Sequence, residues 1–146
     1  AGNWSVGVPA SVISGLSDGT VTVTASVTDA AGNTGSGTHN VTVDTGLPSV
    51  NFNVISGDNV LNAVEKGQDL SVSGTSANLA EGTVVTVTLN GKNYTATTAA
   101  DGTWSLTVPA ADLAGLGQAS YTLNATATNG VGNSVSSAAN LLVDTA

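Results

Sequence analysis

The first 45 residues of this chain return one hundred positions later, so residues 1–45 and residues 101–145 are two copies of one sequence. Aligned without a gap, the copies share 18 identities in 45 pairs, among them a Gly-x-Trp-Ser motif and a closing Val-Asp-Thr. A fixed long period indicates a tandem array of structural repeats. We therefore predict two domains: residues 1–45 form the C-terminal part of a preceding module, and residues 46–146 form one complete module.

Alternating apolar and polar residues predict β-strands along most of the chain. The pattern is clearest at residues 20–28, where Val and Ala fall on one face and Thr and Ser on the other. In the complete module, turn residues recur at the spacing typical of a β-sandwich. Seven strands are predicted there, at residues 49–54, 69–74, 83–89, 93–98, 103–108, 119–128 and 135–143.

The strongest local signal is the Asn-Gly pair at residues 90–91, which is typical of a two-residue hairpin with a type I′ turn. Such a turn fixes the register of its two strands. It places Val87 opposite Tyr94 and Val85 opposite Ala96 on one face.

Residues 1–45 contain counterparts of only the last three strands, near Trp4–Val8, Thr20–Thr28 and His39. Three strands without a partner sheet bury too little apolar surface to be stable alone. The segment either belongs to a module whose remainder lies outside this chain, which we favour, or borrows strands from a neighbour. The predicted fold class is all-β: a seven-stranded sandwich in tandem, with the first module incomplete.

Composition excludes several classes of partner. The chain has a net charge of −8, no Arg, no Cys and only two lysines. Binding to nucleic acid or to an anionic membrane surface needs many more Lys and Arg side chains. No apolar run is long enough to span a membrane, so membrane insertion is not expected. The lack of cysteine fits a reducing compartment or a bacterial exoprotein without disulfides, and the Thr-rich composition favours the second.

Enzymatic catalysis is not expected. The only histidine is His39, and the complete module has Ala139 at the equivalent position. A Ser-His-Asp or Cys-His arrangement therefore cannot exist in the repeat itself. His39 shares the phase of Val41 and Val43, which predicts a partly covered strand residue.

The chain contains four short motifs in an order similar to that of a known family. They are Asp-Ala-Ala-Gly-Asn at 29–33, the segment 58–65, Asp-Gly-Thr-Trp-Ser at 101–105 and Val-Asp-Thr at 143–145. The chain resembles the bacterial Ig-like repeats of giant, secreted, non-fimbrial adhesins. The resemblance implies an Ig-like sandwich in an extracellular rod that is exported by a type I system and stiffened by calcium between modules. It also implies a role in adhesion, biofilm formation and virulence, with other regions contacting a host or abiotic surface.

Acidic and amide side chains supply the oxygen ligands that calcium prefers. Since alternate strands reverse direction, the loop at 56–68 and the end of the last strand lie at one pole of the sandwich. The turns at 101 and 129–133 lie at the other pole, facing a neighbouring module. With the resemblance added, the predicted calcium ligands are Asp29, Asn33, Asp44, Asp58, Asn62, Glu65, Asp101 and Asp144.

Each of these residues also has an ordinary structural interpretation. Asn62 and Glu65 fit a capping box that opens a helical turn, Asp29 fits a common turn, and Asp44 fits a strand exit. The complete module carries Asn129 where the first copy has Asp29, so its pole loses one charge. We interpret Asp18, Asp69 and Asp112 as surface charges.

The leading functional hypothesis is a structural spacer of a large adhesin. The alternatives are a module that itself binds a glycan or a protein, and an accessory domain of a secreted enzyme. Glycan sites usually expose aromatic rings. The sequence pattern predicts that all five aromatic side chains point inward, which favours the spacer: Trp4, Phe52, Tyr94, Trp104 and Tyr121.

Overall fold

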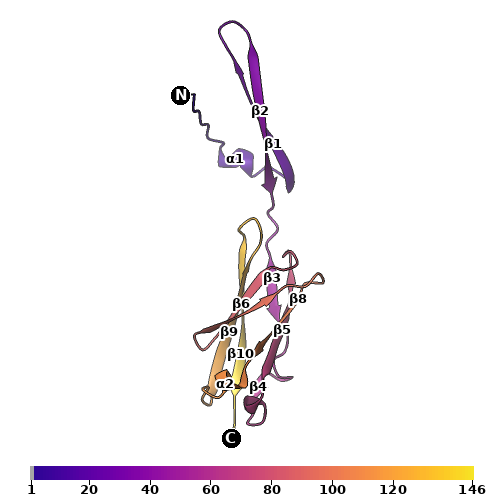
Figure 1. Ribbon diagram of the computed structural model, residues 1–146, viewed down its shortest axis with the longest axis vertical. Helices are drawn as coiled ribbons and strands as arrows, with labels where there is room; N and C mark the ends of the chain where they lie inside the picture. The colour runs from indigo at the N-terminus through magenta and orange to yellow at the C-terminus, as the bar shows by residue number, and fades with distance from the viewer. Residues whose placement is uncertain (1) are drawn as a thin grey trace. The chain divides into compact units, whose positions relative to one another are not determined.

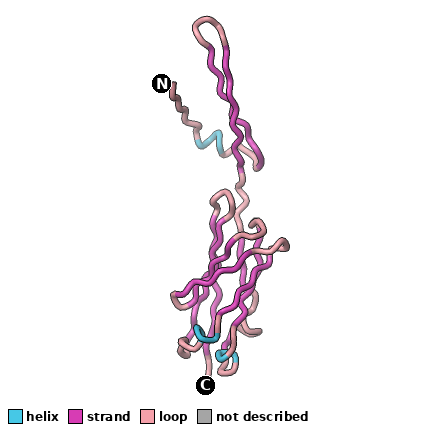
Figure 2. The backbone as a smooth tube through the Cα atoms, in the orientation of Figure 1, coloured by secondary structure: helices cyan, strands magenta, loops and turns pink. Residues whose placement is uncertain are grey.

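The computed structural model describes residues 2–146, and the chain divides into two compact units. Unit 1 spans Ala1–Thr45 and unit 2 spans Gly46–Ala146. Strands dominate both units, as Figure 2 shows. Each unit is described by itself below.

Unit 1 is a β-hairpin preceded by one helical turn. Strand β1 (Gly19–Thr28) pairs antiparallel with β2 (Thr34–Val43), with Gly19 opposite Val43 and Thr28 opposite Thr34. The helical turn α1 (Ala10–Ile13) follows Pro9, whose φ of −61° suits the start of a helix. The unit therefore has one two-stranded sheet and no second layer among its described residues.

Unit 2 is a sandwich of two sheets (Figure 1). The three-stranded sheet has the order β3 (Ser49–Phe52), β5 (Leu70–Ala77) and β8 (Thr103–Val108). The five-stranded sheet has the order β4 (Val60–Leu61), β10 (Ser134–Val143), β9 (Ala119–Thr128), β6 (Val84–Leu89) and β7 (Lys92–Thr97). All pairings are antiparallel except β4 with β10, which is parallel.

The seven strands expected in the complete module are all present, within three residues of their predicted ends, so the all-β sandwich is confirmed. The Asn-Gly hairpin has the predicted register, with Val87 opposite Tyr94 and Val85 opposite Ala96. Positive φ angles of 51° at Asn90 and 80° at Gly91 give the turn the backbone of type I′.

The core of unit 2 is built around Trp104, which is 2% exposed. Its ring meets Phe52 edge-on, with 5.5 Å between centroids and 77° between planes. Trp104 lies opposite Gly74 on the neighbouring strand, and a Cβ at Gly74 would overlap both the indole ring and the carbonyl oxygen of Asn51. Glycine is therefore required at position 74, where the Trp104 ring lies against the neighbouring strand.

Two features of unit 2 were not predicted. Strand β4 is only two residues long, and a strand that short has no readable periodicity. The short helix α2 (Ala110–Leu113) fills a second loop and buries Leu113. By contrast, η1 (Glu65–Gly67) is the helical turn that the sequence offered as one alternative for Asn62 and Glu65. No helix within residues 2–146 has the length and apolarity needed to cross a membrane.

The strand expected near Trp4–Val8 is absent, so this prediction is wrong. Its counterpart β8 pairs only with β5, and residues 1–45 contain no copy of β5. Residues 2–9 therefore have no ladder partner and form no strand. The prediction that all aromatics point inward is also wrong for Trp4, which is 70% exposed because nothing described in unit 1 covers it.

Candidate metal-binding loops

Four of the predicted ligands lie at one end of unit 2. The parallel pairing of β4 with β10 joins the loop that carries Asp58 to the end of the last strand. The backbone N–H of Leu142 donates to the carbonyl of Asn59 at 3.0 Å, and that of Asp144 donates to the carbonyl of Leu61 at 3.1 Å. The loop and Asp144 thus come from distant parts of the chain to the same end of the sandwich.

Side chains in this loop hold its own backbone. The Oδ1 atom of Asp58 accepts from the N–H of Val60 at 2.9 Å. Asn62 Oδ1 accepts from the N–H of Glu65 at 3.0 Å, and Glu65 Oε2 accepts from the N–H of Asn62 at 3.0 Å. These reciprocal bonds are the capping box that the sequence offered as an alternative, and they open the turn η1.

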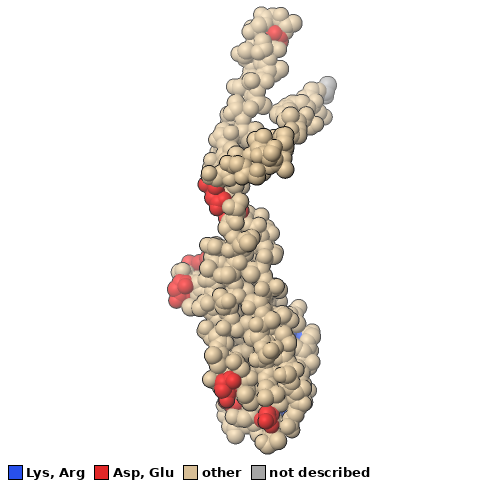
Figure 3. Space-filling view, turned by 180° about the vertical axis from the view of Figure 1, so that it is seen from behind, with Lys and Arg blue, Asp and Glu red and all other residues tan. Residues whose placement is uncertain are grey.

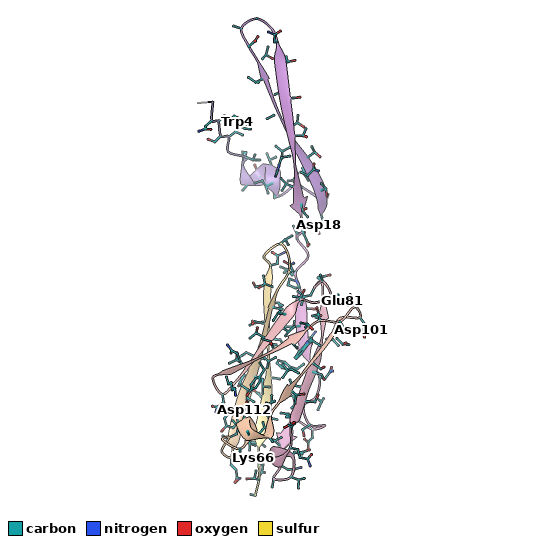
Figure 4. The ribbon with its side chains drawn as sticks, viewed as in Figure 1. Trp4, Asp18, Lys66, Glu81, Asp101 and Asp112 are labelled. Carbon is teal, nitrogen blue, oxygen red and sulfur yellow. The ribbon has the colours of Figure 1, made fainter. Side chains whose placement is uncertain are left out.

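Asp101 lies at the opposite end of unit 2, as Figure 4 shows, on the same side as Glu81 and away from Lys66 and Asp112. Its Oδ1 atom accepts from the hydroxyl of Thr103 at 2.7 Å and from the backbone N–H of Thr103 at 3.0 Å. These hydrogen bonds favour the carboxylate and hold the pKa of Asp101 below its ordinary value. The side chain is exposed and closes a tight turn between β7 and β8.

Asp29 and Asn33 lie together in the hairpin turn of unit 1. Asp29 Oδ1 accepts from the N–H groups of Ala31 and Asn33, both at 2.9 Å, and Oδ2 accepts from the Asn33 side-chain amide at 3.1 Å. The hydrogen bonds from the Asn33 side chain and backbone lower the pKa of Asp29. Asn129 forms the same turn in unit 2, with Oδ1 accepting from the N–H of Asn133 at 2.8 Å.

Asp44 follows the last residue of β2, so it lies at the end of the hairpin opposite the Asp29 turn. Next to it, Asp18 accepts from the hydroxyl of Thr45 at 2.6 Å and from its N–H at 3.0 Å. These bonds lower the pKa of Asp18 and close the open end of the hairpin. The structure therefore separates Asp44 from Asp29 within unit 1.

These residues have the ligand atoms that calcium prefers, but their arrangement in space supports a calcium site less well. All the predicted ligands offer oxygen atoms, which suit a hard cation. Within residues 2–146, however, there is no group of three or more His, Cys, Asp or Glu side chains placed to hold a metal ion. On the face seen in Figure 3, acidic side chains lie at separate places and not in a single patch.

Like Asp18, the other two acidic residues interpreted as surface charges, Asp69 and Asp112, have structural partners. Asp69 Oδ1 accepts from the N–H of Ala110 at 2.9 Å, which ties the start of β5 to the first turn of α2. Asp112 Oδ2 accepts from Lys92 Nζ at 2.7 Å and from the Tyr94 hydroxyl at 2.8 Å. Only the pairing of β5 with β8 and the position of α2 beside β7 bring these groups together, so no short motif signals them.

The Lys92 and Tyr94 hydrogen bonds hold the pKa of Asp112 below its ordinary value, and Lys92 contributes most. Burial, followed by the hydrogen bond to Asp112, raises the pKa of Tyr94 to about 12. This group is a structural clamp between α2 and β7. The lowered pKa of Asp112 and the raised pKa of Tyr94 both lie away from neutrality, whereas acid–base catalysis at physiological pH uses groups with pKa values near neutrality.

His39 lies opposite Val23 in the β1–β2 ladder, and its side chain is exposed. The expectation of a partly covered residue is wrong, because no second sheet lies over this face among the described residues of unit 1.

Comparisons with known proteins agree on the family. The sequence profile of the bacterial Ig-like domain family matches residues 50–145. No curated protein sequence matches the chain. Several similar solved structures come from large adhesins or adhesion proteins.

The first is a Ca2+-stabilized adhesin that helps an Antarctic bacterium reach out and bind ice: 33% identity, TM-score 0.53, covering 86% of this chain and 32% of that one. The second is a tetra-tandem repeat in the extending region of a large adhesion protein: 35% identity, TM-score 0.56, covering 90% of this chain and 33% of that one. The third is from a 1.5-MDa bacterial ice-binding adhesin studied for host cell surface retention. It has 35% identity and a TM-score of 0.52, and the match covers 98% of this chain and 47% of that one. The chain therefore spans less than half the length of these structures.

Proposed function

This chain belongs to the family of bacterial Ig-like domains, and from that premise we propose that it is a spacer module of a large extracellular adhesin. In this role the module extends the polypeptide away from the cell, while other regions bind a host or abiotic surface and support biofilm formation. Its direct partners are neighbouring Ig-like modules of the same polypeptide.

The observation that carries this proposal is the repeat itself. Residues 1–45 and 101–145 not only share sequence but form hairpins of the same register, with Thr28 opposite Thr34 and Thr128 opposite Ser134. A repeated structural unit at fixed spacing is what an extended array requires. The similarity to a tetra-tandem repeat in the extending region of a large adhesion protein supports the same role.

We further propose that calcium stiffens the junctions between modules. The residues that would hold it at one end of unit 2 are Asp58, Asn62, Glu65 and Asp144, all of which offer oxygen atoms at the β4–β10 end. Asp101 would contribute at the opposite end. In unit 1 the corresponding candidates are Asp29 and Asn33 in the hairpin turn, and Asp44 after β2.

The size of the expected effect follows from binding linkage. A cation that binds only the folded state at about a hundred times its dissociation constant stabilises that state by roughly 2.7 kcal/mol. Extracellular calcium sites bind in the range of about 10⁻⁴–10⁻³ M, so occupancy would follow the calcium concentration outside the cell. Without the cation, nearby carboxylates repel by about 1 kcal/mol per pair in water.

The test compares melting and solution scattering with millimolar calcium and after chelation. Chelation is expected to lower the melting temperature and to shorten the end-to-end distance. The double variant Asp58→Asn with Asp144→Asn is expected to lose most of the calcium-dependent shift. Calcium has no role here if the melting temperature and the scattering profile are the same in both conditions.

The single variant Asp58→Asn, compared with Glu81→Gln, separates site binding from general screening, because each removes one negative charge. Glu81 is exposed at the opposite end of unit 2 and is not among the proposed ligands. A Glu81→Gln variant should keep the calcium-dependent shift of the unmodified chain. An equal loss in both variants would point to screening of the net negative charge instead.

A ligand-binding role is the second candidate. An open groove of about 520 Å³ runs between β3 and β10, and its lining includes the amides of Asn51, Asn53, Asn59 and Asn140. Amides can hydrogen-bond to sugar hydroxyls, but the one aromatic side chain of the groove, Phe52, packs edge-on against Trp104. Titration calorimetry against a panel of oligosaccharides decides between the roles, because saturable binding that Asn53→Ala and Asn140→Ala abolish would favour the ligand-binding module.

A further inference from the structure

The Asn-Gly turn between β6 and β7 has no part in the proposed function, but its groups are free to react. Asn90 and Gly91 are both exposed at the tip of the hairpin. Among residues 2–146, no hydrogen bond involves the Asn90 carboxamide or the backbone N–H of Gly91. Both groups therefore face water without a competing partner in the described part of the chain.

A glycine that follows an asparagine permits a reaction within the chain. Hydroxide removes the proton from the glycine N–H, and the nitrogen bonds to the asparagine Cγ, since glycine has no Cβ to block the approach. The bond between Cγ and the side-chain nitrogen then breaks. This nitrogen leaves as ammonia with a proton taken from water, which restores the hydroxide. Water opens the resulting succinimide ring at either carbonyl, which leaves aspartate or isoaspartate.

The sequence has one further Asn-Gly pair, and its side chain is held. Asn129 precedes Gly130, and Asn129 Oδ1 accepts from the backbone N–H groups of Val131 at 3.2 Å and of Asn133 at 2.8 Å. These bonds orient the carboxamide toward its own turn, and they must break before Cγ can rotate to the Gly130 nitrogen. Asn129 is also partly buried, whereas Asn90 is exposed.

Aspartate before glycine can form the same ring, but both Asp-Gly pairs of the chain are poorly placed for it. Asp18 Oδ1 accepts from the hydroxyl and the N–H of Thr45, and Asp101 Oδ1 accepts from the same two groups of Thr103. These hydrogen bonds lower the pKa of each carboxyl group. An ionised carboxylate resists attack by a nucleophile, so neither pair competes with Asn90 near neutral pH.

We propose that Asn90 is a site of spontaneous self-modification, at which the chain deamidates through a succinimide with Gly91 and gains a negative charge. Of the two Asn-Gly and two Asp-Gly pairs, this is the one whose side chain is exposed and makes no hydrogen bond within residues 2–146. The reaction uses water alone and needs no enzyme.

The two products have different consequences for the hairpin. Aspartate followed by glycine suits a type I′ turn as asparagine does, so the pairing of Leu89 with Lys92 is kept. Isoaspartate carries the main chain through its Cβ and Cγ, which adds one atom to the backbone of a two-residue turn. The register of β6 with β7 should then be lost at the tip, where Lys92 Nζ also binds Asp112 at 2.7 Å.

The test incubates the full chain at mildly alkaline pH and follows each asparagine by peptide mapping with mass spectrometry. In the folded chain, Asn90 should convert at least about tenfold faster than Asn129, because two hydrogen bonds restrain Asn129. In guanidinium, where the chain is unfolded, the two rates should agree within about twofold, because both asparagines precede a glycine.

Three results of this comparison would overturn the proposal. The first is an equal rate at Asn90 and Asn129 in the folded chain. The second is a folded chain in which Asn90 stays intact while the unfolded chain converts. The third is a difference that persists in guanidinium, because the preference would then come from the local sequence and not from the hydrogen bonds of the folded chain.

Two variants of the turn complete the test. Asn90→Gly keeps a residue pair that suits a type I′ turn but removes the carboxamide, so its hairpin peptide should gain no acidic form. An acidic form in this variant would place the reaction at Asn93 and overturn the assignment. Asn90→Asp supplies the aspartate product directly. Amide hydrogen exchange within β6–β7 should match between this variant and the aspartate fraction of the aged chain, and should be about tenfold faster in the isoaspartate fraction. Equal exchange in both fractions would contradict the loss of register.

Discussion

Residues 1–45 and residues 101–145 are two copies of one sequence, and their structures agree in the hairpin but differ in the segment that contains the tryptophan. Both copies have a ten-residue strand pair of the same register and a four-residue helical turn after Pro. Trp104 lies in a strand and is buried, whereas Trp4 lies outside any strand and is exposed.

The difference separates local from long-range causes of structure. The hairpin turn closes on itself in both copies: Asp29 N–H donates to the Asn33 carbonyl at 2.9 Å, and Asn129 does the same with Asn133. The strand of Trp104 instead needs hydrogen bonds from β5, and Gly74, the partner of Trp104 on that strand, is thirty positions earlier in the sequence. A strand without a ladder partner leaves its backbone groups to water and gains nothing from being extended.

The largest effect is expected at the two tryptophans. Trp104→Ala should destabilise unit 2 by about 3–5 kcal/mol, because it removes a buried ring that contacts Phe52 and fills the space over Gly74. Trp4→Ala should change stability by less than about 0.5 kcal/mol, because the side chain is exposed. Urea unfolding followed by far-ultraviolet circular dichroism measures both. Equal losses in the two variants would mean that Trp4 is covered in solution.

The hairpin turns should respond alike. Gly32 and Gly132 have φ angles of 90° and 95°, which disfavour any residue with a Cβ. Gly32→Ala and Gly132→Ala should each destabilise their own hairpin by about 1–2 kcal/mol. Amide hydrogen exchange within β1–β2 and β9–β10 should accelerate by similar factors. A much larger effect at Gly132 would show that the hairpin depends on the second sheet.

A smaller, pH-dependent effect is expected at Asp112. Its folded pKa is lowered, so its stabilising contribution is present above the ordinary pKa of an aspartate and is lost as the pH falls through the lowered value. Asp112→Asn should therefore lower the urea midpoint at pH 7, and the two chains should converge toward pH 2. A constant difference across this range would exclude the Lys92 ion pair as the cause.

The smallest effect is confined to the turn where the copies differ in charge. Asp29 has a lowered pKa, so its bonds to Ala31 and Asn33 persist above the ordinary pKa and are lost as the pH falls through the lowered value. The amide shifts of these residues should titrate in acid. The amides that bond Asn129 in unit 2 should not, because that side chain does not ionise. Nuclear magnetic resonance titration of the full chain measures both in one sample.

Much of the candidate site could be placed from the sequence, but its contacts could not. Because alternate strands reverse direction, the sequence predicted that Asp58 and Asp144 lie at one end of unit 2 and Asp101 at the other. For Asn62 and Glu65 the sequence left two alternatives, calcium ligands or a capping box. The structure shows that both side chains bond the backbone of their own turn. Strand β4, which fixes this loop beside β10, is too short to leave a periodic signal.

The sequence by itself determined what depends on neighbours along the chain. Alternation located the strands, Asn90 and Gly91 set a hairpin register, and the period of one hundred residues defined the repeat. Only the tertiary structure decided which faces are covered, because covering requires a second sheet whose residues lie elsewhere in the chain. The same pattern of apolar residues is therefore a core in unit 2 and an exposed face in unit 1.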